Sequence, residues 1–99
     1  MDELLKALAA VALDVSTAED ALDEGAAGAA RDSLDAAADG LAELRNRWPA
    51  LDARERRVLG AAAAPVRARL DAAQARMPRR AAVSTGLAEA DPEQDVEPD

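Results

Sequence analysis

The sequence predicts an all-α protein, an up-down-up bundle of three helices over residues 1–78, followed by an acidic C-terminal tail, residues 79–99, which we expect to be disordered. Apolar residues recur at alternating spacings of three and four in three stretches. Short connections containing Gly or Pro separate these stretches, and no apolar face continues beyond Pro78. The chain is therefore expected to hold one domain of about 80 residues with a thin core.

The first helix is predicted over residues 3–23. Its apolar positions follow an unbroken 4-3-4-3-4 spacing: Leu4, Leu8, Val11, Val15, Ala18 and Leu22. This spacing is typical of a helix that packs along one seam. Gly25 follows the last seam residue, where a left-handed residue commonly ends a helix. We expect a tight turn near residues 24–27.

The second helix is predicted over residues 27–47. Its seam again alternates three and four: Ala27, Ala30, Leu34, Ala37, Leu41, Leu44 and Trp48. Pro49 disfavours helical geometry in the residue before it, so the helix should end near Trp48.

The third helix is predicted over residues 53–77, because Asp52 and Glu55 have the spacing of a capping box. Its seam consists of Leu59, Ala63, Val66, Leu70, Ala73 and Met77. Pro65 lies inside this helix and removes one backbone hydrogen bond, so we expect a kink there rather than a break.

The core must be built largely from small side chains. The chain has 28 Ala and 12 Leu, and a methyl group buries far less apolar area than a leucine side chain. Close approach of the helices must compensate, and a thin core also favours a homodimer. The residues predicted to be buried are Leu8, Val15, Leu34, Leu41, Leu44, Val66 and Leu70.

Charge is sorted along the chain into three blocks. Residues 1–43 carry eleven acids and two bases, residues 44–80 carry three acids and ten arginines, and residues 81–99 carry six acids and no base. In an up-down-up bundle the first and third helices run parallel, which brings Asp14 and Glu19 close to the heights of Arg67 and Arg69. We expect ion pairs there, which would mainly select this topology.

The overall composition favours a protein adapted to molar salt. Its net charge is -8, and eleven of its twelve basic residues are Arg. Carboxylates keep a surface hydrated in concentrated salt, where their mutual repulsion is screened. GC-rich codon usage is the alternative explanation for the abundance of Ala, Arg and Asp, although it accounts less well for the acidic balance.

The predicted connection between the first and second helices resembles a turn found in known proteins. The segment 21–25, followed by Ala30, Leu34 and Ala37, is similar to the helix-Gly-helix turn of tetratricopeptide hairpins and of small acidic three-helix archaeal proteins of unknown function. The whole chain resembles the second group, of haloarchaeal type. This resemblance implies a fold without an assigned activity.

Enzymatic and metal-binding functions are disfavoured by residue content. The chain has no Cys and no His, so it lacks an imidazole base and the usual zinc ligands. Asp32, Asp35, Asp39 and Glu43 lie three or four residues apart but away from the second seam, which indicates a solvated acidic face. We therefore expect no catalytic residue, no metal site and no bound cofactor.

A partner surface is the remaining kind of site. Residues that could bind an anion or a partner lie mostly in the third helix and after it: Arg54, Arg57, Arg67, Arg69, Arg76, Arg79, Arg80 and, near the helix junction, Trp48. These arginines could contact phosphates, and Trp48 could stack on a base or, as we favour, close the end of the bundle. Residues 51–59 also resemble the first helix of helix-turn-helix regulators.

The sequence thus predicts a non-enzymatic, cytoplasmic interaction or scaffold module. The apolar run 4–15 follows two acids instead of a basic region and is too short to span a bilayer, so we expect neither a signal peptide nor a membrane partner. Its partner would be another protein or a second copy. The alternative is a nucleic-acid-associated regulator that uses the arginine-rich third helix, masked by the acidic tail.

Overall fold

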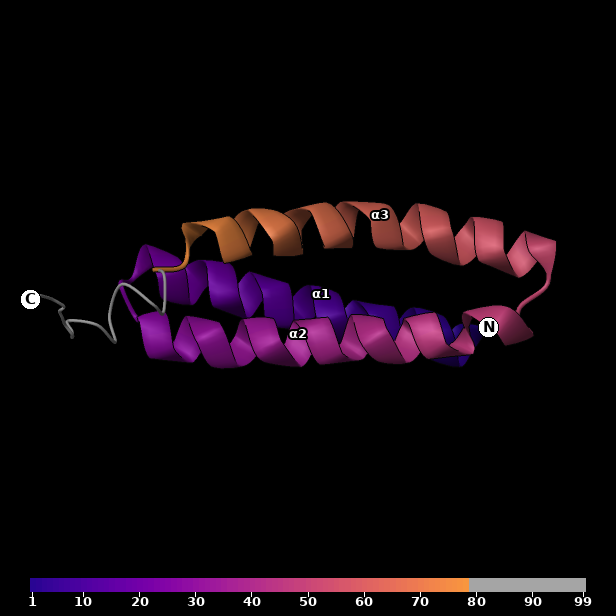
Figure 1. The fold of residues 1–99 in the computed structure, drawn as a ribbon, viewed down its shortest axis with the longest axis horizontal. Coiled ribbons are helices and arrows are strands. Elements are labelled where there is room, and N and C mark those ends of the chain that lie inside the picture. Colours follow the sequence, from indigo (N-terminus) through magenta and orange to yellow (C-terminus); the bar gives the residue numbers. More distant parts are fainter. Residues whose placement is uncertain (79–99) are drawn as a thin grey trace, which may run out of the picture.

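Three α-helices build the domain in the computed structural model, which describes residues 1–78 (Figure 1). The elements are α1 (Asp2–Asp23), α2 (Ala27–Arg47), the short 3-10 helix η1 (Trp48–Ala50) and α3 (Ala53–Arg76). No strand occurs in these residues. The predicted all-α, up-down-up architecture is confirmed, and each predicted helix end lies within one residue of the observed one. The predicted tail lies outside the described residues.

Local sequence signals determine where α1 ends and where α3 begins. Gly25 has a φ of +77°, and the amide of Ala26 donates to the carbonyl of Ala21 at 2.8 Å, which forms a Schellman motif at the end of α1. At the start of α3, the Glu55 amide donates to Asp52 Oδ1 at 2.8 Å and the Asp52 amide donates to Glu55 Oε1 at 3.0 Å. This is the predicted capping box.

Helix α3 continues without a break through Pro65. Its ribbon forms a shallow arch rather than a sharp bend (Figure 1). The helix also continues through Gly60, where a helix-turn-helix motif would need its turn. The nine-residue resemblance to such regulators is therefore not accompanied by their helix arrangement.

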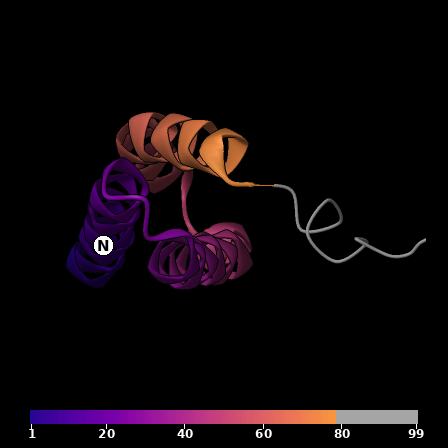
Figure 2. The same ribbon diagram turned by 90° about the vertical axis from the view of Figure 1, so that its left-hand side faces the viewer.

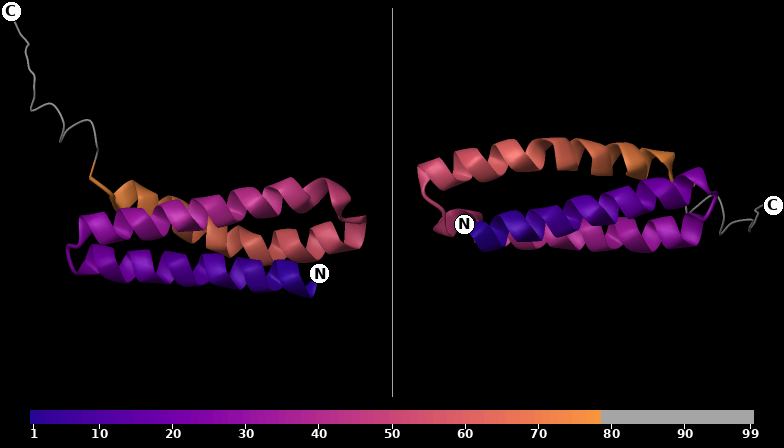
Figure 3. Two further views of the ribbon diagram at one scale, coloured as in Figure 1. Left: turned by 90° about the horizontal axis from the view of Figure 1, so that it is seen from below. Right: turned by 180° about the vertical axis from the view of Figure 1, so that it is seen from behind.

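Helix α1 lies between the other two helices. It packs most extensively on α2 and less extensively on α3, whereas α2 and α3 contact each other at few points. The view along the bundle shows α1 beside both α2 and α3 (Figure 2). Views from below and behind show α2 running antiparallel to both α1 and α3 (Figure 3).

The core consists of small and medium apolar side chains that converge on α1. Six of the seven residues predicted to be buried are buried; Val66 is only half-buried. Val66 packs against the edge of the core, because α2 lies too far from α3 to cover it fully. The buried residues are Leu4, Leu8, Val11, Val15, Ala18, Ala21, Ala30, Leu34, Ala37, Leu41, Leu44, Leu59, Leu70 and Ala73.

Candidate functional site

The sparse contact between α2 and α3 leaves a groove of about 390 Å³, here called the α2/α3 groove. Apolar side chains make up most of its lining, and the rest is two arginines. The lining residues are Leu41, Leu44, Arg45 and Trp48 from the α2 side and Leu59, Gly60, Ala63, Ala64 and Arg67 from α3.

Small residues on α3 explain why the groove is open. Gly60, Ala63 and Ala64 stand opposite Leu41 and Leu44, and their side chains are too short to fill the space between the two helices. Close packing needs complementary volumes across an interface. Helix α2 therefore does not approach this part of α3 closely, and the two helices contact each other at few points.

Trp48 forms one end of the groove. Its ring lies against Gly60, where a Cβ atom would be 3.4 Å from Trp48 Cη2. The side chain nevertheless remains 37% exposed. Trp48 thus packs on α3 near the end of the bundle without entering the buried core, because η1 carries it to the rim of the groove.

Two arginines place positive charge on opposite walls of the groove. Arg45 comes from α2 and Arg67 from α3. Within residues 1–78, no carboxylate lies within salt-bridge distance of Arg45, and Arg67 approaches only Asp71, at 3.7 Å and largely in solvent. Arg45 was not among the candidates from sequence. Its position directly after Leu44 and one turn before Trp48 was the sequence feature that could have indicated a place beside these two residues.

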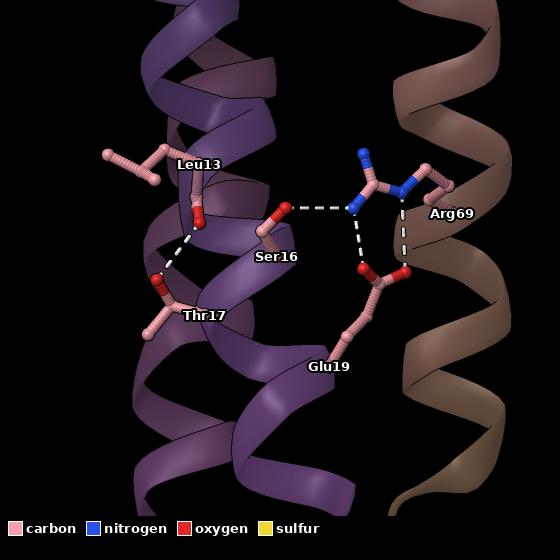
Figure 4. Close-up of polar contacts among 5 residues, drawn as sticks. All are labelled: Leu13, Ser16, Thr17, Glu19 and Arg69. Carbon is pink, nitrogen blue, oxygen red and sulfur yellow. Dashed lines mark hydrogen bonds and ion pairs between the residues drawn. The ribbon is translucent and has the colours of Figure 1, made fainter.

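Arg69 binds α1 rather than a free partner (Figure 4). Its Nη2 and Nε donate to the two carboxylate oxygens of Glu19, with Nε to Oε2 at 3.3 Å. Nη2 also donates to Ser16 Oγ at 3.0 Å. This predicted contact between Glu19 and Arg69 is confirmed. The hydrogen bond from Arg69 lowers the pKa of Glu19, because it stabilises the charged carboxylate.

A second ion pair joins the same two helices. Arg76 Nη2 donates to Asp23 Oδ1 at 2.7 Å. Glu19 and Asp23 lie near the C-terminus of α1, where a helix dipole disfavours negative charge. The two arginines compensate this unfavourable placement.

The expected pair between Asp14 and Arg67 does not form. Residues two apart on an α-helix lie on nearly opposite faces. Because Arg69 faces α1, Arg67 faces the α2/α3 groove instead and approaches Asp71 on its own helix.

The other predicted arginines do not gather into one surface. Arg56, which lies between the candidates Arg54 and Arg57, donates to the backbone carbonyls of Trp48 and Pro49 at 3.3 Å. Arg54 and Arg57 are exposed. Arg79 and Arg80 lie outside the described residues. Of the six candidates that lie within residues 1–78, Arg67 and Trp48 line the groove and the other four do not.

The acidic face of α2 is solvated, as predicted. Asp32, Asp35, Asp39 and Glu43 are all exposed. Within residues 1–78, no group of three or more potential ligands is arranged to hold a metal ion.

In the same part of the chain, no helix combines the length and apolar character needed to cross a membrane.

No protein-family model matches this chain. No curated protein and no solved structure is significantly similar to it. The geometry of the domain therefore carries the functional argument.

Proposed function

We propose that this protein is a non-enzymatic, cytoplasmic docking module that binds a partner protein in the α2/α3 groove. The single observation behind the proposal is a groove lined by Leu41, Leu44 and Trp48 that α1 leaves uncovered. A concave, largely apolar surface edged by an exposed aromatic side chain such as Trp48 is typical of an interaction site. The abundance of acids would keep the module hydrated in molar salt.

The proposal is tested by placing a charge in the groove without disturbing the core. Ala64 lines the groove and is exposed, while Ala62 is exposed on the same helix outside the groove. Ala64→Glu should abolish partner capture in a pull-down from native extract at molar KCl, and Ala62→Glu should leave it intact. Equal capture by both variants would show that binding occurs elsewhere.

Nucleic-acid binding by α3 draws support from fewer residues. Arg54 and Arg57 are exposed, and no carboxylate of residues 1–78 lies within salt-bridge distance of either. Arg69 and Arg76, in contrast, already bind α1. A chain ending at Thr85 lacks the six acids that follow Gly86. If it bound DNA in dilute salt with a steep salt dependence while the full chain did not, this alternative would be favoured.

A further inference from the structure

The α2/α3 groove has the position of a missing fourth helix. In Figure 2, α1 lies beside both α2 and α3, and within residues 1–78 no fourth α-helix lies on the side of α2 and α3 away from α1. The groove continues along both helices away from Trp48. The next hollow is lined by Ala38, Leu70 and Asp71 among others, and a third by Leu34, Asp35 and Met77 among others. A helix bound along α2 and α3 would complete a four-helix arrangement.

A helix suits this groove better than an extended segment. The floor offers apolar side chains, so the backbone polar groups of the occupant find few partners there. A helix satisfies those groups internally and presents apolar side chains along one stripe. Gly60, Ala63 and Ala64 allow that stripe to approach closely.

The charged residues of the groove indicate which kind of helix it can bind. Arg45 and Arg67 stand on opposite walls, and the lining beside Trp48 includes no acidic residue; Asp71 enters the lining only in the next hollow, beside Leu70. Arg45 has no carboxylate partner in residues 1–78, and Asp71 engages Arg67 only weakly. An occupant with carboxylates on both sides of its apolar stripe would complement both walls.

A second copy of this chain fits the groove poorly through a twofold contact. Such a contact would set one groove against the other, hollow against hollow, and Arg45 and Arg67 against like charges. Complementary shape and opposite charge both favour a different molecule.

We propose that the α2/α3 groove binds an acidic amphipathic helix of a partner protein, whose carboxylates pair with Arg45 and Arg67. The inference rests on the proposed docking function and names the partner chemistry at that site. The apolar contacts would supply most of the affinity, and the two arginines would determine which helices are accepted.

Trp48 provides a direct readout, because it is the only tryptophan in the chain and lines the groove. The probe is a Trp-free synthetic helix of about 18 residues, long enough to span the groove. It carries Leu and Ala on one face and Glu on both flanks. A second peptide has Lys at every Glu position. Each is titrated against the full chain while Trp48 emission is recorded.

The acidic peptide should bind saturably in dilute salt, and the Lys peptide should bind at least about tenfold more weakly. Arg45→Glu with Arg67→Glu should reverse this preference. Arg54→Glu with Arg57→Glu changes the net charge equally, outside the groove, and should preserve the preference for the acidic peptide. Ala64→Glu should weaken the binding of both peptides, whereas Ala62→Glu should leave the binding of both unchanged. Circular dichroism checks that each variant keeps its helices.

Different failures have different meanings. Equal binding of both peptides, lost in Ala64→Glu, would overturn the acidic partner while retaining the docking groove. If neither peptide bound at concentrations up to about 1 mM, the docking function itself would fail. If sedimentation showed a dimer that Ala64→Glu dissociates, the occupant would be a second copy. Displacement of the acidic peptide by an oligonucleotide, with the same dependence on Arg45 and Arg67, would assign the groove to nucleic acid. Both of these last results would overturn the proposal.

Discussion

Gly40 of α2 lies so close to Val11 of α1 that a Cβ atom added to Gly40 would be 2.5 Å from Val11 Cγ2. Val11 is buried, and a β-branched residue in a helix has one strongly preferred side-chain rotamer. Its methyl group therefore cannot easily move away. This contact is where α1 and α2 compensate for their small side chains by close approach.

Gly40→Ala should lower the stability of the domain. In an exposed helical position the change would stabilise by about 1 kcal/mol, but overpacking a core costs about 1–3 kcal/mol. The expected result is a net loss in the free energy of unfolding, measured by urea denaturation. Gly28→Ala is the control, because Gly28 lies in the same helix with nothing within 4 Å of its added Cβ.

Gly28→Ala should stabilise the domain by up to about 1 kcal/mol. Val11→Ala, which removes the clashing methyl groups, should reduce the cost of Gly40→Ala in a double-mutant cycle. A higher unfolding midpoint for Gly40→Ala than for the natural chain would show that α1 and α2 can separate at this point without loss.

Truncating a leucine of the core should lower the free energy of unfolding more than truncating a leucine that lines the groove. Leu8 of α1 is 5% exposed and lies outside the α2/α3 groove, whereas Leu41 is 9% exposed and lines it. We expect Leu8→Ala to cost about 3–5 kcal/mol and Leu41→Ala about 2–3 kcal/mol, because the groove already leaves Leu41 with fewer neighbours. Equal losses in chemical denaturation would indicate that the groove is closed in solution.

The ion pair between Glu19 and Arg69 should contribute stability that depends on pH. The pKa of Glu19 is lowered in the folded protein by its hydrogen bonds with Arg69. Its contribution is therefore fully present above the ordinary value of 4.5 and is lost as pH falls through the lower, folded value. Arg69 stays charged throughout this range.

Glu19→Gln should remove part of this acid-side dependence in thermal melts recorded from pH 7 downward. Glu43→Gln is the matched control, because Glu43 is exposed on α2 and makes no ion pair within the described part of the chain. An identical acid-side loss of stability in the natural chain and in Glu19→Gln would contradict the coupling.

Salt should stabilise the whole domain. The chain has a net charge of -8, so screening relieves repulsion among its acids, and concentrated salt also strengthens apolar burial. The three ion pairs of residues 1–78 are largely exposed and lose little. The melting midpoint should rise from dilute buffer to molar KCl. A level or falling midpoint would contradict both the repulsion and the adaptation to molar salt.

Much of the fold was determined by the sequence alone. The alternating spacings, Gly25 and the Asp52 capping box predicted the three helices to within a residue at each end. These signals act within one helix or one turn, so the chain defines them locally. The contact between Glu19 and Arg69 was also predictable, since parallel helices with level starts fix the relative heights of their residues.

Only the tertiary structure decided which pair of helices would stay apart. The seams of α2 and α3 show that each helix has an apolar side, but they do not show how far apart the two helices lie. That spacing depends on the summed volumes of side chains from all three helices, including the small residues Gly40 and Gly60. The same spacing half-exposes Val66 and leaves a groove beside Trp48 and Arg67, because α1 alone cannot cover both partners on every side.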